Sequence, residues 1–141
     1  MSNWIYENKE VLSENLPENA IGFIYLITNL TNNKKYIGKK LLTKAGTENK
    51  LLKNGTKKKV KCRKESDWKK YWSSCDELKE EVKKLGEENF KREILCFTFS
   101  MATHTYLENK YLYVNEVLES EDWYNSNISS KIFKQNILGK I

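Results

Sequence analysis

The sequence predicts an α+β fold in which a small three-stranded antiparallel sheet is flanked by helices. Two short runs rich in β-forming residues, 22–28 and 35–38, are separated by the turn NLTNNKK, a pattern typical of an antiparallel hairpin. A third such run, residues 89–99, lies between two segments with helical patterns. The 141 residues are enough to bury a core, so we expect a single domain over residues 1–141.

Residues 1–20 are expected to form an N-terminal arm. The only proline, Pro17, lies in ENLPENA, and Trp4, Ile5 and Tyr6 give the arm apolar side chains for docking. The arm lacks the apolar centre of a signal peptide, and no apolar run approaches the roughly 18–20 residues of a membrane span. We therefore expect a cytoplasmic protein with no membrane partner.

The run GFIYLIT is expected to be a central strand, because it is apolar at nearly every position. KYIG, residues 35–38, is its expected partner. From Lys39 to Lys64 no period is sustained, so residues 39–64 are expected to be a long basic loop, which in a compact domain is usually functional or disordered. A β-excursion within this loop, near Leu51 and Val60, is left open.

Two helices are expected after the basic loop. Ser74 and Glu77 have the spacing of a capping box, and the helix that follows should end at Gly86. A shorter helical segment over residues 66–72 precedes it, with Ser66 as the N-cap. The second long helix fits residues 101–120, where one apolar stripe contains Leu107, Tyr111, Val114 and Leu118.

The charge of the chain is concentrated in one block. Residues 34–64 contain twelve lysines and Arg63 against one acid, Glu48, a net charge of +12, whereas the whole chain carries +6. A basic block on a mildly acidic body is typical of a protein that binds a polyanion, with nucleic acid the leading candidate. The alternative is a solvated loop that keeps the protein soluble. Three cysteines without a CxxC pair and a single histidine argue against a zinc site.

A few side chains on this scaffold could carry chemistry. Tyr25 lies on the central strand, Tyr36 opens the next strand close to Gly38, and Glu108 lies beside the apolar stripe of the second helix. A carboxylate that binds one divalent ion, phenols that move protons and nearby cations suffice for phosphodiester cleavage. A phenol does this if lysines or the metal lower its pKa. The alternative is that both tyrosines fill the core and Glu108 is solvated.

Two further features have open interpretations. His104 lies one helical turn before Glu108 and could approach a metal, although a lone histidine there is more often a surface residue. Trp68, Tyr71 and Trp72 could stack on nucleic-acid bases or, as is more common at helical spacing, pack against the sheet.

The segment GFIYLITN…KKYIGKK resembles the paired signature of the GIY-YIG nuclease family. Tyr25 falls at the tyrosine of the first element, with Phe23 in the usual glycine position, and YIG itself is intact at residues 36–38. Further along the chain, LKKLGEENFKREIL, YLENKY and WYN are similar to later family motifs in the same order. The resemblance covers roughly residues 20–130 and is strongest to small bacteriophage members, several of which are regarded as homing-type endonucleases.

The resemblance implies a metal-dependent DNA endonuclease that cuts double-stranded DNA with one divalent ion, Mg²⁺ or Mn²⁺. It implies that Tyr25 and Tyr36 lie together near the attacking water, one of them as general base. Glu108 would bind the metal, and Asn125 in WYN would orient a phosphate or support the metal site.

The sequence departs from the family at one position. The family places an arginine about ten residues after the YIG tyrosine, where this chain has Gly46; if the basic insertion is skipped, Asp67 occupies that place. Arg63 is the first candidate for the catalytic cation and Lys40 the second, with Lys64 or Lys69 left open. The departure also supports a rival reading, a catalytically impaired nucleic-acid-binding or regulatory module.

Contacts with DNA are expected from the basic block and its surroundings. Little chain follows WYN, so target preference is expected in the basic loop, the arm or oligomerisation, and the oligomeric state, monomer or homodimer, is open. The expected contact residues are Lys39, Lys40, Lys57, Lys58, Lys59, Lys61, Arg63, Lys64 and Lys69.

Overall fold

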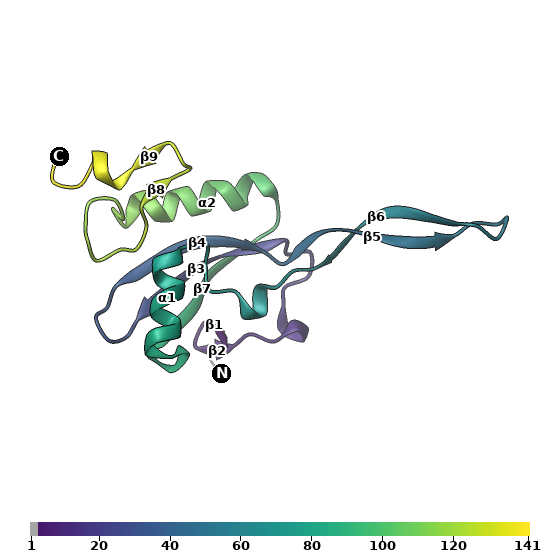
Figure 1. Ribbon diagram of the computed structural model, residues 1–141, viewed down its shortest axis with the longest axis horizontal. Coiled ribbons are helices and arrows are strands. Elements are labelled where there is room, and N and C mark those ends of the chain that lie inside the picture. The colour runs from purple at the N-terminus through teal and green to yellow at the C-terminus, as the bar shows by residue number, and fades with distance from the viewer. Residues whose placement is uncertain (1–2) are drawn as a thin grey trace.

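Strand β3 (Gly22–Asn29) lies inside a five-stranded mixed sheet with the order β2-β1-β7-β3-β4, as the computed structural model of residues 3–141 shows (Figure 1). Its neighbours β4 (Lys35–Leu41) and β7 (Phe90–Thr98) both pair with it antiparallel. Helices cover both faces of the sheet, so the side chains of β3 are buried on both sides. This double cover explains why the strand is apolar at nearly every position. The predicted α+β fold class and hairpin are therefore confirmed.

The prediction of three strands is wrong, because the N-terminal arm adds two more. Strand β1 (Trp4–Tyr6) pairs parallel with β7, and β2 (Lys9–Glu10) closes this edge antiparallel to β1. The docking of the arm is confirmed, since Trp4 is 1% exposed and its indole Nε1 donates to the Trp68 carbonyl at 2.6 Å. Strands of three and two residues are too short to leave an alternating pattern in the sequence.

The prediction of a long basic loop over residues 39–64 is also wrong. Residues up to Leu41 belong to β4, and the remainder forms a hairpin of β5 (Thr43–Leu51) and β6 (Lys57–Glu65) that projects from the domain (Figure 1). Its register is unbroken from the Thr43–Glu65 pair to the Leu51–Lys57 pair. Neither face of this ribbon packs on the core, so no apolar alternation marks it in the sequence. The open suggestion of β-structure near Leu51 and Val60 is confirmed.

Helices α1 (Asp76–Leu85) and α2 (Met101–Val114) lie on opposite faces of the sheet (Figure 1). The core on the α1 side contains Phe23, Tyr25, Ile27, Trp68, Leu78 and Val82. The core on the α2 side contains Ile24, Ile37, Leu112, Val117 and Leu118. Successive residues of β3 therefore enter different cores, as strand geometry requires.

Helix α1 begins at a different residue from the one predicted. Its N-cap is Cys75, whose side chain makes no capping hydrogen bond, so the predicted Ser74–Glu77 capping box is absent. The Ser74 hydroxyl instead lies 3.4 Å from the hydroxyl of Tyr36. The predicted stop is confirmed, because Gly86 follows the helix with a positive φ of 94°.

Helix α2 ends at Val114, and the predicted stripe is confirmed at Leu107 and Tyr111, which pack against the core, but not at Val114. Val114 is 71% exposed, whereas His104 and Leu112 are the buried residues of the helix. Glu108 lies midway between these two at a spacing of four residues, so it shares their face. The inner face of α2 therefore also contains a histidine and a glutamate, which an apolar pattern does not mark.

The buried position of His104 corrects the expectation of a surface histidine. It is 1% exposed, and its Nδ1 lies 2.7 Å from the Thr98 hydroxyl. Burial, with a contribution from Lys39, lowers the pKa of His104 to about 4. The imidazole is therefore neutral near pH 7 and serves the packing of α2 on the sheet.

The other segments are short. A 3₁₀ turn, Trp68–Lys70, replaces the predicted helical segment over residues 66–72, although Ser66 Oγ does accept the Trp68 N–H at 3.3 Å. Trp68 is buried, and its ring centroid lies 6.2 Å from that of Phe23. This agrees with packing against the sheet. Further 3₁₀ turns span Ser13–Asn15, Glu87–Asn89 and Lys134–Asn136, and a small hairpin pairs β8 (Asn127–Ile128) with β9 (Ile132–Phe133). Over residues 3–141, no helix has the length and apolar character needed to cross a membrane.

Candidate active site

The two tyrosines of the opening hairpin lie side by side on the α1 face of the sheet. Tyr25 pairs with Gly38 across β3 and β4, and its ring centroid lies 6.1 Å from that of Tyr36. Tyr25 is 1% exposed, whereas Tyr36 is half-buried. The structure therefore brings the predicted pair together but leaves only Tyr36 within reach of a substrate.

Gly38 makes this arrangement possible. A Cβ at this position would lie 2.4 Å from the Tyr25 hydroxyl oxygen and 3.0 Å from the Tyr36 ring. Both rings are held by the surrounding core, so neither can yield cheaply.

We expect Gly38→Ala to reduce the free energy of unfolding by about 1–3 kcal/mol through overpacking. Gly46→Ala is the matched control, because a Cβ there would meet only the flexible side chain of Lys64. Urea unfolding of the two variants checks the prediction, which fails if both are equally stable.

The burial of the phenols changes their expected acidity. Burial raises the pKa of Tyr36 to about 12, against a smaller lowering by its hydrogen bond with Ser74. Burial likewise raises the pKa of Tyr25 well above its ordinary value, with further contributions from Tyr36 and Tyr71. In the chain without a metal, neighbouring lysines therefore do not lower the pKa of either phenol, which was the condition for a phenol to move a proton. At neutral pH both phenols carry their protons.

The outer edge of β4 positions the other site residues. Strand β4 is the last strand of the sheet, so the outward N–H groups of Lys35, Ile37 and Lys39 lack a strand partner. The Lys35 N–H donates to the Asp122 carbonyl at 2.9 Å, and the Ile37 N–H donates to Asn125 Oδ1 at 3.1 Å. The backbone N–H of Lys39 lies near enough to the Glu108 carboxyl to favour its charged form and lower its pKa. Asn125 and Glu108 are thus fixed along one edge by backbone groups that need partners.

Asn125 acts on this edge as a short strand would. Its Nδ2 also donates to the Ile37 carbonyl at 2.8 Å, so its amide pairs with both backbone groups of one residue. The side chain is buried, with 4% exposure. This arrangement favours a positioning role over direct contact with a phosphate.

Glu108 is half-buried where α2 crosses the β4 edge. Burial raises the pKa of its carboxyl, while the charge and the backbone N–H of Lys39 oppose that rise. A buried carboxylate with a raised pKa gains more from a bound cation than a solvated one does. Glu108 was predicted to emerge at the border of the buried face. It lies slightly further inside, because His104 and Leu112, one turn away on each side, are buried.

Tyr36, Glu108 and Asn125 line one polar hollow of about 690 Å³ beside the β4 edge. Lys39, Ser74, Asp76, Asn127 and Ser130 are also part of its wall. The residues come from two strands, two helices, the turn before α1 and the segment after α2. Tyr25, Lys40 and Arg63 are not among the lining residues, so the structure assembles only part of the predicted constellation there.

The residues of this hollow fit a single hard cation. Among residues 3–141, no three His, Cys, Asp or Glu side chains gather at one point, and the other carboxylate lining the hollow, Asp76, pairs with Lys79 at 3.5 Å. One carboxylate with space for several water molecules suits Mg²⁺, which usually keeps much of its hydration and binds through one or two carboxylates. Glu108 is the residue that would hold the ion.

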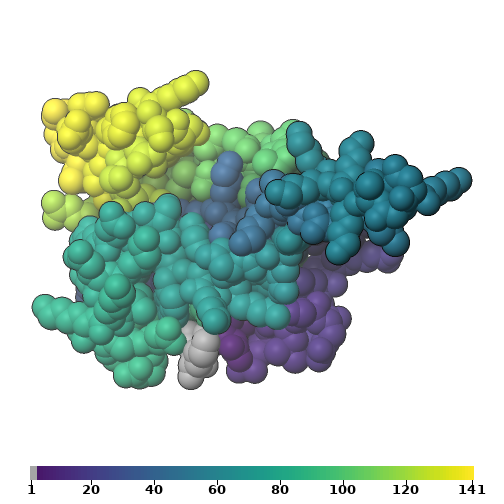
Figure 2. Space-filling model, turned by 45° about the vertical axis from the view of Figure 1, so that its right-hand side comes forward, coloured from purple at the N-terminus to yellow at the C-terminus, as the bar shows by residue number. Residues whose placement is uncertain are grey.

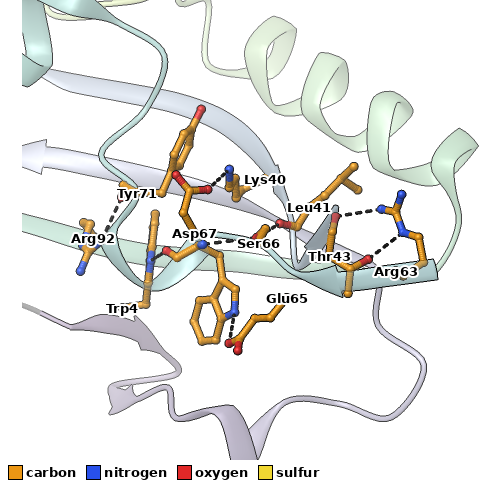
Figure 3. Close-up of polar contacts among 11 residues, drawn as sticks. Trp4, Lys40, Leu41, Thr43, Arg63, Glu65, Ser66, Asp67, Tyr71 and Arg92 are labelled. Atoms are coloured by element: carbon orange, nitrogen blue, oxygen red, sulfur yellow. Dashed lines mark hydrogen bonds and ion pairs between the residues drawn. The ribbon is translucent and has the colours of Figure 1, made fainter. Parts of the chain in front are cut away.

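The candidate catalytic cations lie apart from each other (Figure 3). Lys40 Nζ is 2.6 Å from the Asp67 carboxylate and 4.0 Å from the centroid of the Tyr71 ring. Arg63 lies at the base of the β5–β6 hairpin, where its Nε and Nη2 donate to the Thr43 hydroxyl and carbonyl at 3.1 and 2.8 Å. The cation in the wall of the hollow is Lys39, which the sequence pointed to only as a DNA contact. Its outward position on β4, alternating with Tyr36 and Lys40, is the signal that could have identified it.

Arg92 is a buried cation that the sequence did not single out. Its guanidinium lies between the rings of Trp4 and Trp72, at 4.7 and 4.4 Å from their centroids, and donates to the carbonyls of Lys69 and Tyr71. Burial lowers the pKa of Arg92 to about 10. Arg92 holds the segment after the hairpin against the sheet. Its position in β7 between the buried Phe90 and Ile94, each two residues away, is the sequence signal that could have identified it as buried.

The predicted DNA-contact lysines fall into two groups. Lys57, Lys58, Lys59, Lys61 and Lys64 are exposed on the hairpin together with Arg63. Lys69 lies on the 3₁₀ turn and pairs with Glu65 at 3.3 Å, and Lys39 Nζ donates to the Thr105 hydroxyl at 3.0 Å. The basic block therefore extends from the hollow to the end of the hairpin.

The paired tyrosines, the edge glutamate and the asparagine clamp on one small sheet define the chain as a GIY-YIG domain. A family model described as "Putative endonuclease segE, GIY-YIG domain" matches residues 4–128, so the chain belongs to this family. In particular, it is similar to a protein of Enterobacteria phage T4, "Putative endonuclease segE", with 31% identity over 103 residues. The match covers 73% of this chain and 39% of the T4 protein, so the chain spans about two fifths of that relative's length. No solved structure matches the chain.

Proposed function

We propose that the chain is a divalent-metal-dependent endonuclease that hydrolyses phosphodiester bonds of double-stranded DNA. The observation that carries the proposal is the hollow at the β4 edge, where Tyr36, Glu108 and Lys39 meet. Membership of the GIY-YIG family and the description of the T4 relative as an endonuclease support it. The net charge of +12 carried by residues 34–64 suits a polyanionic substrate.

Each residue of the hollow has a role in this proposal. Glu108 holds one Mg²⁺ or Mn²⁺, which when bound polarises the scissile phosphate and stabilises the leaving oxygen. Tyr36 directs its hydroxyl toward the attacking water and moves the proton. The buried ring of Tyr25 packs against the ring of Tyr36 and fixes its position, and Asn125 holds the β4 edge in place. Lys39 neutralises charge that develops on the phosphate.

The cationic role can be assigned by three matched variants. We expect Lys39→Gln to lower the cleavage rate at saturating DNA by about 10²-fold, the typical effect of losing one electrostatic donor. Lys40→Gln should have a smaller effect, because Asp67 neutralises this lysine and it does not line the hollow. Arg63→Gln should weaken DNA binding and leave the saturated rate nearly unchanged.

Single-turnover cleavage of a labelled duplex over a range of protein concentrations separates rate from affinity. A saturated rate that falls as far in Arg63→Gln as in Lys39→Gln would contradict this assignment. It would place the catalytic cation at the base of the hairpin instead.

A second candidate function is a DNA-binding or regulatory module that does not cut. The ion pair of Lys40 with Asp67 at 2.6 Å favours it, because a carboxylate stands where the family has an arginine. The two candidates differ in a plasmid assay with Mg²⁺ or Mn²⁺. Nicked or linear plasmid that disappears with EDTA supports the endonuclease, whereas binding without cleavage supports the module.

The phage origin of the relative suggests the setting in which the protein acts. We take it to be of phage or mobile-element type and to act in the cytoplasm of a host cell, as a monomer or a homodimer. Cell fractionation and analytical ultracentrifugation, with and without a duplex, would test the location and the assembly.

A further inference from the structure

The β5–β6 hairpin has two chemically different faces. In its continuous register, every second residue of each strand shares a face. One face, here called the cation face, carries a row of cations from β6 beside a row of mostly short side chains from β5. Its members are Lys57, Lys59, Lys61 and Arg63 on β6, and Ala45, Thr47, Asn49 and Leu51 on β5.

The opposite face carries a mixture of groups. Glu48 lies among its lysines, and Val60 and Cys62 are partly covered there. The side chain of Lys64 fills the space above Gly46, with its Cδ only 2.8 Å from where a Cβ would be. The members of this face are Lys44, Gly46, Glu48, Lys50, Lys58, Val60, Cys62 and Lys64. Several lysine stems are therefore positioned to shield apolar side chains on this face.

The charges of the cation face are available to a partner. Within residues 3–141, no ion pair involves Lys57, Lys59, Lys61 or Arg63. The acid at the base of this face, Glu65, already pairs with Lys69 and accepts from the Trp68 indole. The hairpin projects from the domain in Figure 1, and its end extends beyond the body of the molecule in Figure 2.

The cation face is continuous with the candidate active site. Ala45 and Arg63 line a hollow at the hairpin base together with Lys39 and His104, and Lys44 is its one lining residue from the opposite face. Lys39 also lines the hollow that contains Glu108 and Tyr36. A polyanion that crosses the β4 edge at Lys39 therefore meets the base of the cation face next.

The dimensions of this face suit a nucleic-acid duplex. Same-face residues of a strand recur about every 6.8 Å, so the cations from Lys57 to Arg63 cover about 20 Å. A two-stranded ribbon fits the major groove of B-DNA, which is about 12 Å wide. The short side chains of Ala45, Thr47 and Asn49 allow the ribbon to approach the base edges while the neighbouring cations reach phosphates.

We infer that the hairpin binds double-stranded DNA through its cation face, as a ribbon seated in the major groove beside the scissile site. The row of β6 cations contacts the phosphates of one strand. Lys58 and Lys64, which belong to the same basic block, face away from the duplex. This inference rests on the proposed function, because it takes duplex DNA to be the substrate.

Two triple variants with equal charge changes test the inference. Lys57→Gln, Lys59→Gln and Lys61→Gln together remove three cations from the cation face, and Lys50→Gln, Lys58→Gln and Lys64→Gln remove three from the opposite face. Binding of a fluorescein-labelled duplex is measured by anisotropy in EDTA over a range of salt concentrations. The far-ultraviolet circular dichroism and melting temperatures of both variants should match those of the wild type, since all six lysines are exposed.

The cation-face variant should bind about 10²- to 10³-fold more weakly near 0.1 M salt, with a salt slope smaller by about 2–3, as expected for three lost phosphate contacts. The opposite-face variant should change the slope by less than about 1. Equal losses, a larger loss on the opposite face or no loss in either variant would overturn the inference. Binding in EDTA is independent of cleavage, so a wild type that never cuts would refute the proposed function alone.

Discussion

Glu108→Gln is expected to lower DNA cleavage by at least about 10²- to 10³-fold, because several kcal/mol of metal-assisted stabilisation are lost. The substitution removes the charge of the carboxylate but keeps its shape, so the interaction with the backbone N–H of Lys39 can persist. Folding should be unaffected or slightly improved, since burial already disfavours the charged form. Single-turnover rates with Mg²⁺ and Mn²⁺, beside melting temperatures, check both parts.

Glu119→Gln is the matched control. Glu119 is exposed in the segment after α2, so the same chemical change there alters the net charge without touching the hollow. A rate loss of similar size in both variants would mean that net charge, and not a metal at Glu108, determines cleavage.

Tyr36→Phe is expected to slow cleavage by about 10²- to 10⁴-fold, the usual range for a group that transfers a proton in the transition state. Its hydroxyl lines the hollow and lies 3.4 Å from the Ser74 hydroxyl, so its removal leaves the fold intact. Because burial raises the pKa of Tyr36 to about 12, the phenolate fraction increases with pH throughout the neutral range. The wild-type rate should therefore rise from pH 7 to pH 9, and this rise should be smaller in Tyr36→Phe.

Tyr25→Phe separates chemistry from packing. The Tyr25 hydroxyl is buried against Gly38 and interacts with the Tyr71 side chain, so this variant should lose about 0.5–1.5 kcal/mol of stability and keep most of its rate. If Tyr25→Phe loses more activity than Tyr36→Phe, the roles given to the two tyrosines are reversed.

The central hairpin and third strand of the fold could be predicted because local chemistry determines them. Asn29 forms the turn after β3 by accepting hydrogen bonds from the amide and hydroxyl of Thr31, and asparagine favours such turns in any context. β1 and the β5–β6 hairpin could not be predicted in the same way. β1 depends on a parallel pairing with residues about 90 positions further along the chain, and the hairpin is stabilised by backbone pairing without a buried face.

In the candidate site, too, local motifs could be predicted and contacts between distant residues could not. Tyr36 and Glu108 were identified from their motifs, and the structure places both in one hollow. The clamp of Asn125 on Ile37 and the pairing of Lys40 with Asp67 join residues distant in sequence, so no local pattern predicts them. Glu108 was expected beside the apolar stripe, and it lies half-buried between His104 and Leu112, the buried residues of α2.

The central claim is that the β4 edge joins Tyr36 and Glu108 into one site that cuts DNA. The most direct test is the single-turnover cleavage rate of the Tyr36→Phe, Glu108→Gln double variant beside the wild type and both single variants. Groups that act as a unit are strongly non-additive, so the double variant should be about as slow as the slower single variant. A wild type without metal-dependent cleavage, or a double variant slowed by the product of the two single losses, would contradict the claim.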